Sequence, residues 1–189
     1  MKKYTILAAA ALLALSASAD EMKITLTDGT TVSYDVDKVS EITFETATAE
    51  TVAGAYTGTQ AVNIGGTFNY SAEITVTVVE NADGTLNVTY PQYSLAGTVM
   101  GDITLSELTI PNVPFDESKN AYYLDYSNLG LKQHFKAERN GVASMDNDYV
   151  LGATSTITLE KTDTGIKITN PFKLGAMPLP ITATFTGDK

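Results

Sequence analysis

Residues 70–78 carry the clearest pattern in the chain, because apolar or small side chains alternate there with polar ones. The first set is Tyr70, Ala72, Ile74, Val76 and Val78, and the second is Ser71, Glu73, Thr75 and Thr77. A period of two residues is typical of an antiparallel strand with one buried face. Turn residues occupy 81–84, and residues 86–90 alternate again, which predicts a hairpin.

The rest of the chain to residue 189 repeats this alternation in short segments separated by turns. The predicted inward sets are Ile103 and Leu105; Leu108 and Ile110; Tyr122, Leu124 and Tyr126; Leu131, Gln133 and Phe135; Ile157 and Leu159; Ile166, Ile168, Asn170 and Phe172; and Met177, Leu179, Ile181, Ala183 and Phe185. The phase changes between Leu105 and Leu108, which predicts a β-bulge. Eight to ten strands at this spacing indicate an all-β barrel or sandwich.

A second, smaller β pattern precedes this region. Residues 22–36 alternate around Asp28-Gly29, a dipeptide typical of hairpin turns, and Ile42-Thr43-Phe44 resumes the alternation. We therefore predict four segments: a leader at 1–19, a small β unit at 20–46, a linker at 47–52 and a barrel domain at 53–189. A hairpin of this size is marginally stable alone, so we expect residues 22–44 to pack on the larger domain or on a protein partner.

The first nineteen residues have the features of a secretory signal peptide. Lys2 and Lys3 precede an apolar run, and Ala17-Ser18-Ala19 provides a small-residue cleavage site. The run is too short for a membrane helix, so we expect no membrane insertion. The chain has no cysteine, so neither lipid attachment at cysteine nor a disulfide is available. We expect a periplasmic or extracellular protein.

The order of several short motifs resembles the calycin-like, or lipocalin-like, β-barrel domains of exported proteins from Bacteroides and its relatives. The motifs are Gly54-Ala55-Tyr56-Thr57-Gly58-Thr59, Asp83-Gly84-Thr85, Tyr93-Ser94-Leu95 before Gly101-Asp102-Ile103, and Phe185-Thr186-Gly187. The resemblance implies a closed or nearly closed antiparallel up-and-down barrel, with room for an interior ligand. The small unit at 20–46 resembles a short β leader found near the N-termini of exported proteins from the same bacteria.

Charge and residue types argue against several functions. The formal net charge is −10, and the leader removes two lysines and no acid, so nucleic acid is not an expected partner. His134, the one histidine, falls in the outward phase beside Lys132 and Lys136, where a general base would lack a cleft. The acidic residues Asp102, Glu107, Asp116, Glu117 and Asp125 keep a two-carboxylate glycosidase as a weak alternative.

Asp146-Asn147-Asp148 has a spacing seen in calcium loops, but the turn glycine and the closing glutamate are missing. We expect no metal site, no cofactor and no enzymatic activity.

Polar residues in the inward phase are the candidate ligand contacts. Gln133 and Asn170 place amides inside an apolar barrel, where each needs a hydrogen-bond partner. Two interpretations stay open: each amide binds neighbouring backbone, or each orients a ligand in a mostly apolar pocket. Tyr122, Tyr126 and Phe135 complete the predicted ligand-binding set.

The sequence therefore predicts an exported, non-catalytic binding module that holds a small, largely apolar ligand in or at the mouth of a barrel. The alternative is a structural or protein-interaction module, in which side chains fill the barrel and the unit at residues 22–44 docks on a partner.

Overall fold

The computed structural model describes residues 21–25, 29–40 and 51–189. Contacts divide the chain into two compact units, Met1–Ala49 and Glu50–Lys189, and each is described by itself. The regular elements of the described residues are all β-strands, apart from the 3-10 turn η1 at Val36–Lys38, which confirms the all-β class. Within these ranges no helix has the length and hydropathy to cross a membrane.

The small unit contains an antiparallel hairpin of β1 (Glu21–Thr25) and β2 (Thr31–Asp35). Gly29, at the turn, has a φ of 86°, a left-handed conformation that favours glycine. At the end of β2, Asp35 accepts a hydrogen bond from the N–H of Asp37 and begins η1. The predicted strand at residues 42–44 and most of the predicted linker lie outside the described residues.

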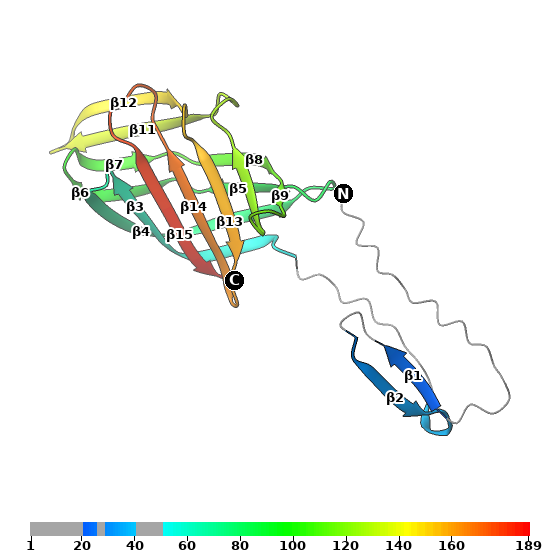
Figure 1. Cartoon of the computed structure of the whole chain (residues 1–189). Helices are drawn as coiled ribbons and strands as arrows, with labels where there is room; N and C mark the ends of the chain where they lie inside the picture. The colour runs from blue at the N-terminus through cyan, green and yellow to red at the C-terminus, as the bar shows by residue number, and fades with distance from the viewer. Residues whose placement is uncertain (1–20, 26–28, 41–50) are drawn as a thin grey trace. The chain divides into compact units, whose positions relative to one another are not determined.

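The large unit contains thirteen strands in two hydrogen-bonded sheets of nine and four strands, shown in Figure 1. In chain order they are β3 (Gly54–Ile64), β4 (Phe68–Glu80), β5 (Leu86–Tyr90), β6 (Tyr93–Thr98), β7 (Gly101–Leu105), β8 (Leu108–Val113), β9 (Phe115–Asp116), β10 (Ala121–Asp125), β11 (Lys132–Arg139), β12 (Val142–Val150), β13 (Thr156–Lys161), β14 (Gly165–Phe172) and β15 (Ile181–Asp188).

Several consecutive strands continue one another along the barrel. Tyr90 pairs with Leu108, and three residues further along each strand Tyr93 pairs with Leu105. The same register therefore runs through β5 and β6 on one side and β7 and β8 on the other. The strands β10 with β11 and β12 with β13 also continue one another, but the register shifts by one residue between the pair Asp125–Thr156 and the pair Lys132–Val150. The result is eight long strands in an up-and-down meander, as the alternation and the resemblance predicted.

The barrel is nearly closed. The last strand, β15, pairs with the first, β3, along its full length. The two edges of the nine-stranded sheet are β8 and β9. Pro114 lies between these two strands, and its carbonyl accepts a hydrogen bond from the N–H of Tyr123 in β10 at 2.9 Å. Figure 1 shows β6, β7, β11 and β12 at the end of the barrel away from the C-terminus.

The predicted bulge between Leu105 and Leu108 is an interruption of the strand at Ser106 and Glu107. The phase change itself is present, because residues 103, 105, 108 and 110 are all buried. Here the chain leaves the four-stranded sheet and joins the nine-stranded one, so the break allows the long strand to bend.

The prediction for the last strand was wrong at its start. Ile181, Ala183 and Phe185 face the core, but β15 begins only at Ile181. Pro178 and Pro180 carry no N–H for a ladder, and the residues around them form a bend in which Leu179 is 44% exposed.

The hydrophobic core reaches the end of the barrel where the termini of this unit lie. Tyr56 is buried there, and its hydroxyl donates to the carbonyl of Val52 at 2.8 Å. The strands β3 and β15 approach closely at Gly58, where a Cβ atom would collide with the carbonyl oxygen of Thr186.

Candidate binding site

An apolar cavity of about 270 Å³ opens at the end of the barrel opposite to these termini. Strand ends and turns provide its walls, which are Ile64, Met100, Phe135, Met145, Met177, Pro178, Leu179 and Ile181. Ile64 ends β3 and Ile181 begins β15, where the two residues pair across the ladder. The cavity therefore occupies the mouth of the barrel.

Three of the five methionines of the chain, Met100, Met145 and Met177, line this cavity. Methionine is unbranched and polarizable, so it adapts to ligands of different shape. No side chain in the lining carries a charge. The walls are therefore suited to an apolar molecule, and the volume limits it to a small one.

Phe135 is the one residue of the predicted ligand-binding set that lines the cavity. It is buried on β11, and its ring packs edge-on against Tyr149 of β12 with 6.2 Å between ring centroids. The Tyr149 ring therefore packs against one residue of the cavity wall.

Tyr126 and Asn170 meet deeper in the barrel. The Tyr126 hydroxyl donates to Asn170 Oδ1 at 2.6 Å, and both side chains are buried. Burial raises the pKa of Tyr126, and the hydrogen bond to Asn170 counteracts part of that rise. The hydroxyl is consequently protonated at neutral pH. The structure brings these two predicted residues together, although neither lines the cavity.

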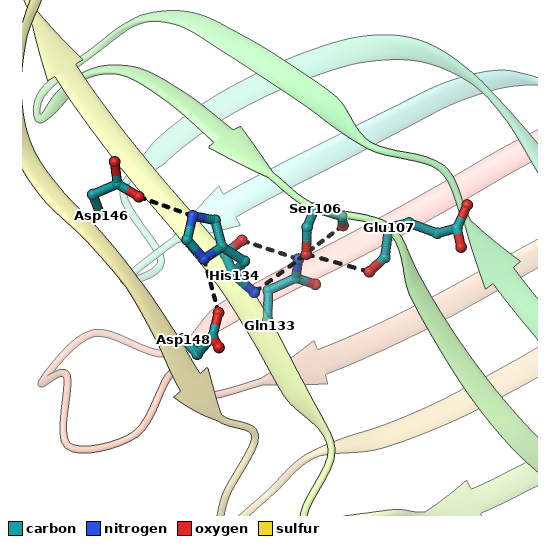
Figure 2. Close-up of polar contacts among 6 residues, drawn as sticks. All are labelled: Ser106, Glu107, Gln133, His134, Asp146 and Asp148. Atoms are coloured by element: carbon teal, nitrogen blue, oxygen red, sulfur yellow. Dashed lines mark hydrogen bonds and ion pairs between the residues drawn. The ribbon is translucent and has the colours of Figure 1, made fainter.

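Gln133 spans the interruption between β7 and β8 (Figure 2). Its Nε2 atom donates to the carbonyl oxygen of Ser106 at 2.8 Å and lies 3.0 Å from the Ser106 hydroxyl. The N–H of Ser106 in turn donates to the carbonyl of His134. The amide thus binds backbone groups that the broken ladder leaves available, which is the structural one of the two interpretations.

Tyr122 lies apart from the other predicted residues. It is half-buried on β10, opposite Leu159 of β13, and its ring packs edge-on against Phe115 at 5.2 Å between centroids. It does not line the mouth cavity. The five predicted residues therefore occupy several levels of the barrel and do not form one pocket.

Sequence reasoning missed three buried polar residues, Gln60, Thr98 and Ser155. Gln60 stands in the inward phase of β3, so alternation alone could have identified it; Tyr90 falls in the alternation of residues 86–90, but its hydroxyl is not among the predicted polar contacts. The methionines of the mouth come from different turns and strands, and no sequence pattern links them.

His134 faces outward, as predicted, and its imidazole lies between two carboxylates of β12 (Figure 2). Nδ1 is 2.8 Å from Asp148, and Nε2 is 2.9 Å from Asp146. The hydrogen bond with Asp148 is the largest cause of a raised pKa of His134; desolvation opposes it, and the hydrogen bond with Asp146 adds to the rise. The arrangement ties β11 to β12 on the outer face.

Other acidic residues hold local turns. Asp116 binds Ser118 and Lys119, and Asp125 accepts hydrogen bonds from Ser127. The contact with Lys119 and then that with Ser118 lower the pKa of Asp116 to about 2. In the described part of the chain, no three His, Cys, Asp or Glu side chains are grouped as a metal site requires.

Comparison with known proteins agrees with this architecture. A search of curated proteins finds no match. Among solved structures, a "putative outer membrane protein" of Bacteroides fragilis is similar at 23% identity and a TM-score of 0.47, over 73% of this chain and 51% of that one. The chain thus spans about half the length of that protein. The family model of the calycin-like beta-barrel domain matches residues 52–188, and the chain belongs to this family.

Proposed function

We propose that this protein is an exported, non-catalytic binding module that holds a small, largely apolar molecule in the mouth of its barrel. The observation that carries the proposal is the cavity of about 270 Å³, with its walls of methionine, phenylalanine and aliphatic side chains. Burying an apolar molecule against such walls is favourable without any directional contact.

Export is proposed from the signal-peptide pattern at residues 1–19. The absence of catalysis is proposed from the chemistry around the cavity. Its lining offers no nucleophile and no titratable group, and His134 lies on the outer face of β11. The acidic sequence makes nucleic acid an unsuitable partner.

A neutral fluorescent probe tests the site directly. We expect N-phenyl-1-naphthylamine to bind the mature protein at one molecule per chain, with enhanced emission. Leu179→Asp places a charge in the cavity wall and should weaken binding at least tenfold. Leu129→Asp is the matched control, because Leu129 is similarly exposed, at 51%, and does not line the cavity. Equal binding by both variants would place the probe elsewhere.

The natural ligand is sought by mass spectrometry of an organic extract of the protein purified from its host. A small molecule at near-stoichiometric amount in the wild type, and absent from Leu179→Asp, would identify it. An extract without such a molecule, together with no binding of the probe, would reject the proposed function.

A second function is proposed for the N-terminal hairpin. Met22 pairs with Tyr34 and Ile24 with Val32, so these four apolar side chains share one face. Ile24, Val32 and Tyr34 are each more than a third exposed. We propose that residues 22–44 dock on a protein partner through this face or by adding a strand. A partner that co-purifies with the wild type should be lost from an Ile24→Lys, Tyr34→Lys variant; its retention would contradict the proposal.

A further inference from the structure

Apart from Tyr56 and Gln133, whose hydrogen bonds are described above, five polar side chains that are at most 4% exposed lie in the interior of the barrel, each from a different part of the wall. They are Gln60, Tyr90, Tyr126, Ser155 and Asn170. Barrel interiors of this size are usually filled by apolar side chains, and buried polar groups cost free energy unless they are hydrogen-bonded. This group of residues, the polar layer, therefore requires an explanation.

Hydrogen bonds place three of the five residues together, and an electrostatic effect places Tyr90 near them. Tyr126 binds Asn170, and the N–H of Tyr126 donates to the carbonyl of Ser155 at 2.9 Å. Tyr126 and Asn170 both influence the pKa of Tyr90, which requires them to be close, although the Tyr90 hydroxyl does not meet the geometry of a hydrogen bond.

Gln60 joins the layer from β3. It stands two residues below Val62, which pairs with Ala183, and Ala183 pairs with Asn170. Barrel strands are tilted against the barrel axis. Inward residues at the same height are therefore not direct ladder partners but are displaced along the strand, from each strand to the next. Gln60 itself pairs with Phe185, and Phe185 pairs with Ile168, two residues from Asn170 on the same face of β14. Gln60 therefore lies within one inward residue of the ladder position of Asn170.

Several atoms of the polar layer have no partner among the described residues. These are Nε2 and Oε1 of Gln60, the hydroxyl of Tyr90 and the hydroxyl of Ser155. Burial raises the pKa of Tyr126 and of Tyr90, and Ser155 and Asn170, respectively, are near enough to counteract part of each rise. Neither the Tyr90 nor the Ser155 hydroxyl, however, reaches the geometry of a hydrogen bond. Together they offer at least one amide donor, one carbonyl acceptor and two hydroxyls that can do either. A group bound to them must therefore both donate and accept hydrogen bonds.

The bound group must also be uncharged. The buried polar residues of the described chain are amides and hydroxyls, with no Asp, Glu, Lys, Arg or His among them. A carboxylate or an ammonium would meet no opposite charge, and its desolvation would be unfavourable. Burial also raises the pKa of Tyr90 and Tyr126, so their hydroxyls stay neutral.

The polar layer lies beneath the mouth cavity. Ile64 and Ile181 line the cavity, and Val62 and Ala183 are the next inward residues below them. Ala183, the ladder partner of Asn170, has a small side chain and fills little of the interior at this position. We propose that the ligand is an uncharged amphiphile: its apolar body fills the mouth, and a hydroxyl or primary amide at its end binds Gln60, Tyr90 and Ser155. This inference rests on the proposed function and names the class of its ligand.

A matched series of compounds tests the class on the mature wild-type chain. 4-Phenyl-1-butanol, 4-phenylbutyrate and butylbenzene share one apolar skeleton and differ in the terminal group. Displacement of the neutral fluorescent probe gives the Kd of each compound. We expect the alcohol to bind at least tenfold more tightly than the carboxylate at pH 7.5. Equal affinity of the two would overturn the proposal.

Variants then locate the head group. Gln60→Met and Tyr90→Phe remove unpartnered atoms with little change of shape, so both proteins should fold. Each should reduce the preference for the alcohol over butylbenzene at least fivefold. Tyr56→Phe is the control, because the Tyr56 hydroxyl binds Val52 near the other end of the barrel, and its preference should equal that of the wild type.

The outcomes separate this inference from the proposed function. If all three compounds bind and no variant changes the preference, the polar layer is satisfied by water and the inference fails, while the apolar site stands. If neither the probe nor any compound binds, the proposed function fails and the inference fails with it.

Discussion

Tyr126 and Asn170 depend on each other within the barrel. Their hydrogen bond of 2.6 Å joins residues 44 positions apart. Tyr126→Phe would leave the Asn170 oxygen without its donor, and we expect the free energy of unfolding to fall by about 1–3 kcal/mol. Urea denaturation measures the loss. Tyr90→Phe is the control, because it removes a hydroxyl that has no partner; an equal loss in both variants would contradict this account.

Gln133 is predicted to stabilise the break between β7 and β8. Gln133→Leu removes the donor to the Ser106 carbonyl and should cost about 1–3 kcal/mol in the free energy of unfolding. Ser106→Ala removes only the hydroxyl and keeps the carbonyl contact, so its loss should be smaller. Denaturation curves of both variants provide the comparison, and a Gln133→Leu protein as stable as the wild type would assign the amide no structural role.

Alternation along the chain was sufficient to predict that Gln133 and Asn170 point inward. Their partners could not be predicted in this way. Ser106 is 27 residues from Gln133, and Tyr126 is 44 from Asn170; such contacts depend on the register of strands far apart in sequence. The choice between a backbone role and a ligand role therefore needed the structure.

On the scale of strands, His134 connects β11 and β12 in a pH-dependent way. Its pKa is raised above the ordinary 6.5, mainly by the hydrogen bond with Asp148. A raised pKa in the folded state means that the stabilisation is fully present below about pH 6.5 and is lost as pH rises through the folded pKa. We expect the amides of β12 to exchange hydrogen more readily at pH 8.5 than at pH 6, after correction for intrinsic rates.

The variant His134→Gln should remove that difference, since glutamine does not titrate in this range. NMR titration of the one imidazole in the chain measures its pKa directly. High salt should reduce the shift, because the ring and both carboxylates are exposed. A pKa at or below 6.5 would reject the contacts of the His134 ring with Asp146 and Asp148.

The paired strands β3 and β15 approach so closely at Gly58 that glycine is needed there. Gly58→Ala would bring a Cβ atom into the Thr186 carbonyl, and the required backbone shift should cost about 1–3 kcal/mol. Thermal unfolding should show a clearly lowered Tm. Gly152→Ala is a suitable control, because its Cβ would meet open space; if both variants unfold at the same temperature, the close approach is not tight in solution.

Alternation along the sequence predicted the boundaries of the strands only in part. The phase change at residues 105–108 correctly marked an irregularity, but a bulge and a bend between two sheets give the same alternation. Near the C-terminus, Met177 and Leu179 continue the period of Ile181 and Phe185, yet two prolines prevent a ladder there. Periodicity therefore extended the strand too far and hid two residues of the mouth cavity.

On the scale of the whole molecule, the fold was predictable and the cavity was not. The barrel follows from repeated alternation and short turns, which are local properties. The cavity follows from Met100, Met145 and Met177, which reach one place from a turn between β6 and β7, from β12 and from the bend before β15. Only closure of the barrel brings them together.

Closure also predicts that the large unit does not depend on the hairpin for its stability. Among the residues that the structure describes, those of the buried hydrophobic core run from Tyr56 to Phe185, and β15 itself closes the ladder onto β3. Deleting residues 21–50 from the mature chain should therefore leave the Tm and the affinity for the neutral probe unchanged. A partner that docks on residues 22–44 should be lost in the same protein. Loss of probe binding after deletion would mean that the hairpin contributes to the ligand site, and the two proposed functions would become one.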